Sequence, residues 1–273
     1  MLNLGCGERY HPDWVNLDMQ AAGPGVIVAN LRGGIPFPDG HFSVVYHSHL
    51  LEHLRRSDAV KLIAECQRVL SPGGIMRVVV PDLEATAREY LRVMDQLDAG
   101  DESARRRHEW LMIELLDQLV RRVPGGEMLT YLKQPGNPEA DYVIGRIGAW
   151  AEVHLRGERA GESAAGDAGR WSRFRLWLRR RRRRLAQLAH SLTDFRERGE
   201  VHQWMYDRHS LTMLVRAAGF GEVVCVDHHQ SRIRDWARYG LDTEPDGRAA
   251  IPVSLYLEAV KLPGPLSGGG RGE

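Results

Sequence analysis

The chain has 273 residues, a length that suits one domain with an insertion or two separate domains. Its apolar content of 43% and charged content of 27% are ordinary for a globular protein. The net charge of +1 gives no overall reason to expect a nucleic-acid-binding protein. No apolar run approaches the roughly 20 residues that a helix needs to cross a bilayer, so we expect no membrane span.

The three cysteines, Cys6, Cys66 and Cys225, lie far apart and show no C-x-x-C spacing. An odd and sparse set argues against a disulfide framework and for a reducing compartment. No signal peptide is recognisable, because residue 3 is already polar and two glycines follow soon after it. We therefore expect a cytoplasmic protein.

The first 84 residues alternate short apolar runs with helical stretches. Strands are predicted at residues 1–4, 14–18, 25–31, 42–48 and 75–82. A helix is predicted from residue 49 to residue 70, followed by a turn at S-P-G-G, residues 71–74. Continuous β-branched runs separated by helices indicate a parallel sheet that is covered on both faces.

The character of the chain changes after this sheet pattern. Two long helices are predicted at 83–98 and 101–123, then a loop-rich stretch, a low-complexity linker at 157–169 and a basic helix at 171–192. The sheet pattern returns with a helix that ends at Gly219 and strands at 222–229 and 253–262. We expect a core formed by 1–84 and 200–262, a helical insertion at 85–199 and a disordered tail at 263–273.

The stretch LNLGCGERY places two glycines directly after the first predicted strand. Gly5 and Gly7 allow the backbone to approach a ligand closely, because glycine has no Cβ. Asp18 closes the next strand 11 residues after Gly7, where a carboxylate can accept hydrogen bonds from a ribose diol. The spacing is shorter than the roughly 20 residues of a dinucleotide site, so a smaller nucleoside ligand fits better.

Three ordered motifs together carry a family resemblance. The stretches LNLGCG with WVNLD, PFPDGHFSVVYHSHLLEHL, and RVLSPGGIMRVVVPDLE resemble class I S-adenosylmethionine-dependent methyltransferases, in particular the group found with bacterial polysaccharide and glycosyltransferase genes. The resemblance covers residues 1–84 and 200–262. It implies a Rossmann-like α/β fold, with a doubly wound, mostly parallel sheet and a helical insertion, and it implies S-adenosylmethionine as the cofactor.

The resemblance also assigns a cofactor site by position. Its residues would be Gly5, Cys6, Gly7, Asp18, Asn30, Leu31, His47 and Ser48. Asn30 stands where the family usually has an acid beside the adenine, and its carbonyl can still accept from the exocyclic amine. Asn3 replaces an acid that is frequent in the first motif, so recognition of the methionine ammonium would depend more on backbone carbonyls.

The stretch HSHLLEHL contains an H-x-x-E-H pattern of His49, Glu52 and His53. One interpretation is the helix of an inverted zinc peptidase. A second is a divalent-metal triad like the E-x-x-E-H of some O-methyltransferases, although we expect the enzyme not to need a metal. A third is that Glu52 and His53 only cap and pack a helix. His49 is the candidate general base, because imidazole ordinarily titrates near neutral pH. His202 and Asp207 could supply or orient that base from the other side of the pocket.

The predicted insertion is expected to cover the acceptor site by analogy with the family. Residues 170–184 within it contain nine arginines and no acid. They predict a solvated surface helix, a peripheral contact with an anionic membrane or polyanion, or a nucleic-acid contact, the last being the least favoured.

The sequence therefore predicts a methyltransferase that transfers a methyl group from S-adenosylmethionine to a hydroxyl of a sugar, glycoconjugate or other small molecule. Two alternatives remain open. One is a metal-dependent hydrolase that uses His49, Glu52 and His53. The other is a degenerate methyltransferase fold that acts as a nucleic-acid- or membrane-binding module.

Overall fold

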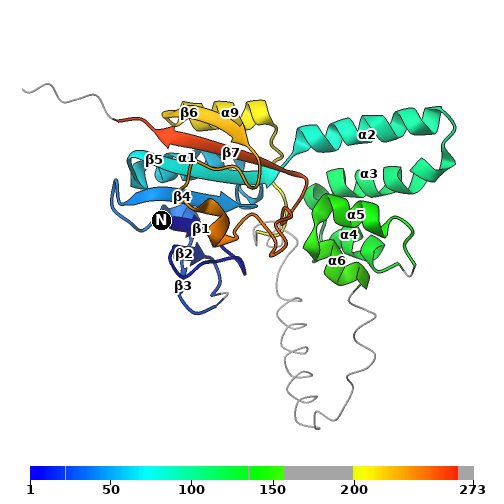
Figure 1. The fold of residues 1–273 in the computed structure, drawn as a ribbon, viewed down its shortest axis with the longest axis horizontal. Helices are drawn as coiled ribbons and strands as arrows, with labels where there is room; N and C mark the ends of the chain where they lie inside the picture. Colours follow the sequence, from blue (N-terminus) through cyan, green and yellow to red (C-terminus); the bar gives the residue numbers. More distant parts are fainter. Residues whose placement is uncertain (22, 135, 157–198, 264–273) are drawn as a thin grey trace, which may run out of the picture. The chain divides into compact units, whose positions relative to one another are not determined.

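The computed structural model describes residues 1–21, 23–134, 136–156 and 199–263 (Figure 1). The expectations for the linker, the basic helix with its arginines and most of the tail fall outside these residues. The chain divides into two compact units, Met1–Ala85 with Gln203–Glu273, and Thr86–His202. The predicted boundaries, after residues 84 and 199, lie within three residues of this division.

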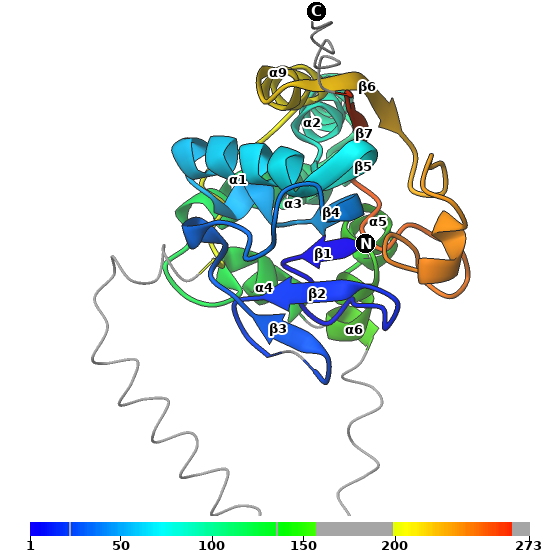
Figure 2. The same ribbon diagram turned by 90° about the vertical axis from the view of Figure 1, so that its left-hand side faces the viewer.

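The first unit is built on a seven-stranded sheet with the order β3-β2-β1-β4-β5-β7-β6 (Figure 2). The strands are β1 (Leu2–Leu4), β2 (Val15–Asp18), β3 (Val26–Val28), β4 (Phe42–Ser48), β5 (Leu70–Pro81), β6 (Phe220–Val226) and β7 (Ser254–Lys261). β1 to β5 pair in parallel, whereas β7 is antiparallel to both β5 and β6. The predicted Rossmann-like fold class with a mostly parallel sheet is confirmed.

The two faces of the sheet are covered differently. On one face lie α1 (Arg56–Val69) and α9 (Arg208–Ala217), whose apolar side chains join those of the strands in the main core. The other face is covered by the segment between β6 and β7, which contains the short 3-10 helix η5 (Trp236–Tyr239). Trp236 and Leu241 from this segment pack there against Trp14, Tyr46 and Tyr256. The second face thus receives its apolar cover from a connection that the sequence pattern leaves unassigned.

Two predicted boundaries in the first unit are wrong. The S-P-G-G sequence does not form a turn before β5 but lies inside it, where the register against β4 shifts between Phe42 and Val44. The helix predicted to start at residue 49 starts at Arg56, and a 3-10 turn, η2 (Leu51–His53), precedes it. His49 adopts a φ of +49°, which is not helical, and the extended backbone of Leu54 and Arg55 separates η2 from α1.

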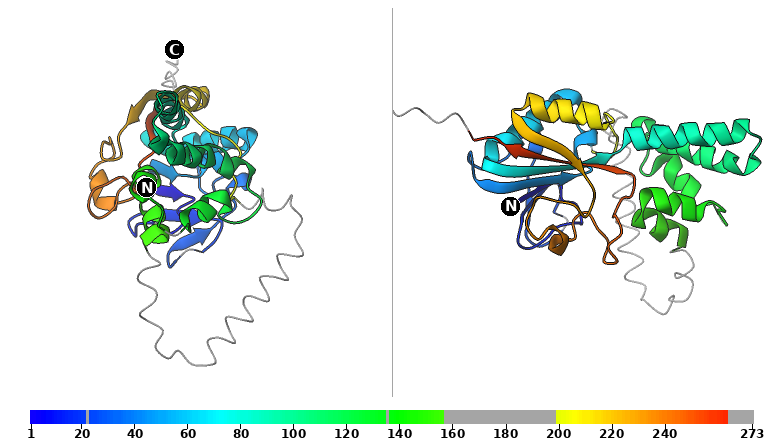
Figure 3. Two further views of the ribbon diagram at one scale, coloured as in Figure 1. Left: turned by 90° about the vertical axis from the view of Figure 1, so that its right-hand side faces the viewer. Right: turned by 45° about the horizontal axis from the view of Figure 1, so that its top comes forward.

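The second unit is helical (Figure 3). Its elements are α2 (Leu83–Asp98), which begins in the first unit, η3 (Glu102–Ala104), α3 (Arg105–Val120), α4 (Gly126–Leu132), α5 (Ala140–Ile147) and α6 (Ala149–Arg156). The prediction of a loop-rich stretch after residue 123 is therefore wrong. This stretch forms three short helices, and most of its Gly and Pro residues lie before or between them. Apolar side chains of these helices, including Tyr131 and Val143, pack around the buried Trp110. Within the described part of the chain, no helix is both long and apolar enough to cross a membrane.

A buried arginine joins the sheet to its second cover. Arg77 on β5 has no exposed surface and pairs across the ladder with Glu258 on β7, at 2.8 Å. Its Nε lies 2.7 Å from Asp242 Oδ2, and its remaining donors reach the carbonyls of Asp227, His228 and Gln230. One buried cation thus holds the β6–β7 connection at its start, residues 227–230, and in its middle, at Asp242.

Replacement of Arg77 by Met keeps an unbranched side chain but leaves Asp242 and Glu258 without their cation. We expect Arg77→Met to lose roughly 3–5 kcal/mol of unfolding free energy, because the carboxylates of Asp242 and Glu258 would remain buried without a positive partner. Chemical denaturation followed by circular dichroism measures this loss. Arg232→Met is the control, since it breaks a surface pair with Glu222 that is worth about 1 kcal/mol or less. Equal losses in the two variants would contradict the role given to Arg77.

Candidate functional site

The strand order reverses between β1 and β4. β2 and β3 continue outward from β1, whereas β5 continues outward from β4 on the other side. Ligands of open α/β sheets bind outside the carboxyl ends of the strands at such a position. The loop after β1, the ends of β2 and β3, and the residues after β4 therefore form the candidate site.

The loop after β1 is shaped by its two glycines. Gly5 has a φ of +62°, and a Cβ added there would lie 2.9 Å from Leu50, so the loop depends on glycine for conformation and for space. Gly7 has a φ of +49°, and a Cβ added there would meet nothing within 4 Å. The loop is therefore tightly seated at Gly5 and open at Gly7.

Asp18, the last residue of β2, lies beside this loop. Its Oδ2 accepts a hydrogen bond from the Gly7 amide at 2.9 Å, and its Oδ1 accepts one from the Gln20 amide at 3.0 Å. Each carboxylate oxygen can accept further hydrogen bonds. The carboxylate is thus oriented by the backbone and still able to bind a diol.

Apolar surface follows at the ends of β2 and β3. Met19 and Val28 are each more than half exposed, although large apolar side chains usually find cover. Nearby in the chain, Asn30 Oδ1 accepts from the Arg32 amide and caps a short 3-10 helix, while Leu31 packs on the core. The sequence analysis did not predict Met19 and Val28 as site residues. The available signal was the position of Met19, an apolar residue directly after Asp18 at the end of β2.

Two residues of the first motif have structural roles. The buried Asn3 donates its side-chain amide to the Arg9 carbonyl and to Asn16 Oδ1, so it anchors the loop after β1 from inside. Burial and the neighbouring Asp18 raise the pKa of the Cys6 thiol to about 11, so that thiol stays protonated at neutral pH. Neither side chain presents charge to a ligand.

His47 is the predicted cofactor residue whose placement the structure corrects. Its ring has no exposed surface and lies in β4, and both of its nitrogens are buried without a hydrogen-bond partner. Burial lowers its pKa to about 4, although the nearby Glu52 acts in the opposite direction. His47 is therefore a neutral core residue, and its side chain does not line an accessible site.

His49 follows β4 at the same edge of the sheet. Its Nδ1 lies 3.1 Å from Glu52 Oε1, and its Nε2 lies 3.1 Å from the hydroxyl oxygen of Ser254, the first residue of β7. Glu52 is fully buried, whereas His49 remains partly exposed beside Ser48. A carboxylate against Nδ1 favours the tautomer with its proton there, which leaves the Nε2 lone pair directed at a hydroxyl. The positive φ of His49 is a strained conformation of the kind that collects at functional sites.

The H-x-x-E-H set does not form one helical face. Glu52 Oε1 lies 3.9 Å from His53 Nε2, but His49 uses one nitrogen towards Glu52 and the other towards Ser254. Glu52 Oε1 thus lies within ion-pair distance of both histidine rings. A divalent ion held by His49, Glu52 and His53 stays an untested prediction.

The structure gives the other two predicted catalytic residues different surroundings. Asp207 caps α9 by accepting from the amides of His209 and Ser210, and these hydrogen bonds lower its pKa. His202 is buried in the second unit, where its amide donates to the Gln118 carbonyl. Catalytic roles for Asp207 and His202 stay predictions.

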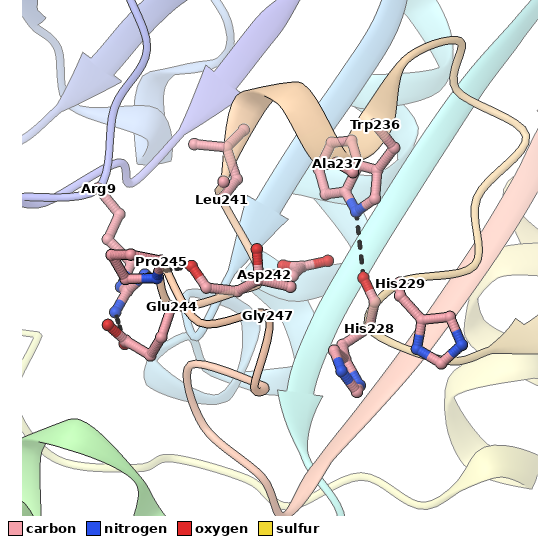
Figure 4. Close-up of a pocket in the computed structure, with 12 residues that line it drawn as sticks. Arg9, His228, His229, Trp236, Ala237, Leu241, Asp242, Glu244, Pro245 and Gly247 are labelled. Atoms are coloured by element: carbon pink, nitrogen blue, oxygen red, sulfur yellow. Dashed lines mark hydrogen bonds and ion pairs between the residues drawn. The ribbon is translucent and has the colours of Figure 1, made fainter.

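A cavity of about 480 Å³ lies in the first unit, against the β6–β7 connection (Figure 4). Arg9 and Glu244, which form an ion pair, lie on one side of it, and His228 lies on the other. A smaller hollow of about 30 Å³, lined by His49 and Ser254 among others, shares Arg9, Leu241 and Asp242 with this cavity. The sequence analysis did not predict this cavity. The available signal was indirect: a single charged residue within each of the apolar strands β5 and β7 indicates a buried ion pair.

Comparison with known proteins gives two matches along the sequence. Residues 7–78 match the family model described as "Methyltransferase domain". A probable S-adenosylmethionine-dependent methyltransferase of Mycolicibacterium smegmatis is 32% identical over 99 residues, which is 30% of this chain and 38% of that protein. The matches support a class I S-adenosylmethionine-dependent methyltransferase. The chain covers less than two thirds of the curated relative that it matches.

Solved structures give alignments of low identity. A methyltransferase of Thermotoga maritima, described as a possible histamine N-methyltransferase, aligns over 95% of this chain and 81% of its own at 12% identity, with a TM-score of 0.38. A methyltransferase of Archaeoglobus fulgidus aligns over 95% and 85% at 10% identity, also with a TM-score of 0.38.

The cofactor of such a methyltransferase is S-adenosylmethionine, and the residues at the reversal point fit it. The open backbone at Gly7 leaves space for a ligand, and the oriented carboxylate of Asp18 can accept from a ribose diol. The exposed side chains of Met19 and Val28 offer an apolar surface to an adenine ring. Asn30 Oδ1 already accepts from the backbone but has a second lone pair for the adenine amine.

The burial of His47 predicts an acid-sensitive fold. Because the folded pKa of about 4 lies below the ordinary value of 6.5, the unfolded chain binds a proton that the folded chain does not between these values. Stability contributed by neutral His47 is complete above pH 6.5 and is lost as the pH falls towards 4, by a total on the order of 3 kcal/mol.

We expect His47→Leu to lose less thermal stability than the wild type between pH 7 and pH 4.5. Circular dichroism melting curves at several pH values measure the difference. His209→Gln, which removes an exposed histidine of α9, should keep the wild-type dependence. The same acid sensitivity in His47→Leu would show that other groups cause it.

Proposed function

We propose that this chain is an S-adenosylmethionine-dependent methyltransferase that methylates a hydroxyl of a sugar or glycoconjugate, with His49 as the general base. The observation that carries the proposal is the series of close contacts Glu52–His49–Ser254 at the carboxyl end of β4, in which His49 Nδ1 lies 3.1 Å from Glu52 Oε1 and Nε2 lies 3.1 Å from the Ser254 hydroxyl. There an imidazole nitrogen already contacts a hydroxyl oxygen beside the reversal point of the sheet. The family match over residues 7–78 supports the cofactor part of the proposal.

Bound S-adenosylmethionine supplies a methyl group on a sulfonium, which is already an activated leaving group. The protein's main task is therefore to align the acceptor oxygen with the methyl carbon and sulfur. Gly5 and Gly7 shape the loop on which the cofactor would lie, and Asp18 would fix its ribose. Ser48 ends the neighbouring strand β4 and His49 follows it, so the acceptor oxygen would meet the methyl group close to His49.

His49 would accept the proton of the acceptor hydroxyl at Nε2. The buried Glu52 holds the opposite nitrogen at 3.1 Å, which orients the ring and stabilises the imidazolium that forms when the proton arrives. Ser254 has a second partner, because its hydroxyl also lies 2.9 Å from the Ile251 carbonyl and can donate to it. An acceptor hydroxyl can therefore replace Ser254 at His49 without leaving the serine unpaired.

The cavity against the β6–β7 connection is the proposed acceptor site. It lies next to the hollow at His49, with which it shares lining residues, and it offers charged and polar groups from Arg9, Asp242, Thr243 and Glu244. A molecule with several hydroxyl groups can satisfy such a lining by hydrogen bonds. This polarity supports a carbohydrate acceptor, whereas the bound methyl donor would occupy the opposite side of the reversal point.

Calorimetric titration with S-adenosylhomocysteine tests the cofactor site. We expect the wild type to bind and Asp18→Ala to bind at least tenfold more weakly, because the ribose hydroxyls lose their acceptor and the loop at Gly7 loses its anchor. Asp13→Ala removes a surface carboxylate of the same loop region and should leave binding unchanged. An absence of binding by the wild type would overturn the proposal.

Release of S-adenosylhomocysteine with a panel of glycosides as acceptors tests His49. We expect His49→Asn to reduce kcat by roughly 10²–10⁴-fold and to remove the acid limb of the pH–rate profile, because Asn tolerates the positive φ but cannot act as a base. Glu52→Gln should keep the acid limb and reduce kcat by a smaller factor. If His49→Asn kept the wild-type rate, a group other than His49 would have to accept the proton of the acceptor hydroxyl.

A further inference from the structure

Three consecutive residues after β6 bring together the donor atoms that transition metals prefer. Asp227, His228 and His229 each offer one ligand atom, and these three atoms lie within 4.8 Å of one another. We propose that they bind a divalent transition metal of the zinc type at the edge of the cavity described above. This set is separate from the H-x-x-E-H residues and from the loop after β1.

The distances suit a small ion. Asp227 Oδ1 contacts His228 Nδ1 directly and lies 3.6 Å from His229 Nδ1. Donor atoms around a tetrahedral zinc are about 3.3 Å apart, because the metal–ligand bonds are about 2.0 Å long. The His229 pair is thus already near the required separation, and the His228 pair has to open from hydrogen-bond contact. Two imidazoles and one carboxylate favour borderline ions over Mg²⁺ or Ca²⁺.

The backbone under these ligands is held in place. Arg77 donates to the carbonyls of Asp227, His228 and Gln230 from its buried position on β5. Trp236 Nε1 also donates to the His228 carbonyl, and Figure 4 shows this bond beside the two histidine rings. Ligands on a fixed backbone lose less conformational entropy when a metal binds.

The local charge also favours a cation. Arg77 is paired with the carboxylates of Asp242 and Glu258, and Asp227 adds a third acid to this neighbourhood. Arg232, five residues further along the chain, forms an ion pair with Glu222. A divalent ion at Asp227 would therefore reduce an excess of negative charge.

The position at the cavity suggests what the metal would do. His228 and His229 line the cavity, and three protein ligands leave coordination positions for oxygen donors within it. A pair of neighbouring hydroxyl groups on a carbohydrate could fill them, and this role in acceptor binding rests on the proposed function. Binding of the metal itself does not depend on that function.

Titration of the full chain with Zn²⁺, after removal of metal by EDTA and dialysis, tests the site. We expect one zinc equivalent to bind, and at least tenfold weaker binding by Asp227→Asn and by His229→Gln. His229 is 62% exposed, so His229→Gln should fold like the wild type, as circular dichroism can check. His209→Gln and His154→Gln are matched controls on α9 and α6, and they should bind zinc as the wild type does.

Three results would overturn the proposal: no saturable binding, full affinity in His229→Gln, or a loss of binding caused by His53→Gln alone. Substitution with Co²⁺ adds a spectroscopic test, because the visible absorption bands should change in His229→Gln. The affinity for S-adenosylhomocysteine, measured with Zn²⁺ and with EDTA, should be the same. A protein that binds zinc but not S-adenosylhomocysteine would contradict the proposed function and leave the metal site standing.

Discussion

A buried guanidinium determines how the first unit is closed. Arg77 lies in the middle of β5 with no exposed surface, and an unpaired charge in that position would cost several kcal/mol. Its donors need carboxylates and carbonyls, and no single neighbouring strand supplies enough of them. Glu258 on β7 supplies one, and the rest come from the start and the middle of the β6–β7 connection, at residues 227–230 and at Asp242. The connection is therefore required to lie over this face of the sheet.

The cavity follows from the same requirement. Asp242 is both a partner of Arg77 and part of the cavity wall, and it accepts a short hydrogen bond from the Tyr46 hydroxyl. Desolvation raises the pKa of Asp242, and the nearby Arg77 acts in the opposite direction. The charge inside the cavity and the stability of its wall thus depend on one ionic cluster. A substitution chosen to change acceptor binding at Asp242 would also change folding, whereas Thr243 and Glu244 lie outside the cluster.

Local patterns predicted much of this fold, and the exceptions have physical causes. β4 and α2 were predicted at their observed bounds, because a continuous β-branched run and an amphipathic period are signals contained in neighbouring residues. Asp18 and Gly7 lie together because Asp18 ends β2 and Gly7 follows the adjacent parallel strand β1, and the role of Asp18 at a ribose stays a prediction. The helix start at residue 49 was wrong because His49 has a positive φ and Leu54 and Arg55 are extended, and the apolar pattern of the sequence contains no signal for these conformations.

The site beyond the reversal point could not be predicted in the same way. Ser254 meets His49 across 205 positions of the chain, and Asp242 meets Arg77 across 165. Contacts at such separation leave no periodic signal in one sequence. A lone charge in a buried strand nevertheless indicates that a partner exists, and both Arg77 and Glu258 are of this kind. The error with His47 has the opposite origin, because alternation along β4 points its side chain into the core.

Two kinds of chemistry lie near each other, because His49 lines the small hollow beside the cavity, whereas His228 and His229 line the cavity itself. At His49, the buried carboxylate of Glu52 takes one ring nitrogen and leaves the other directed towards a hydroxyl, which suits proton transfer. At the other end, His228 and His229 have no buried carboxylate behind them, and their donors converge on the exposed Asp227, which suits a cation. A base must keep its lone pair for the reacting oxygen, so a metal is more useful at a distance from it. An ion at Asp227 could orient an acceptor through hydroxyl groups that do not react, while His49 acts on the one that does.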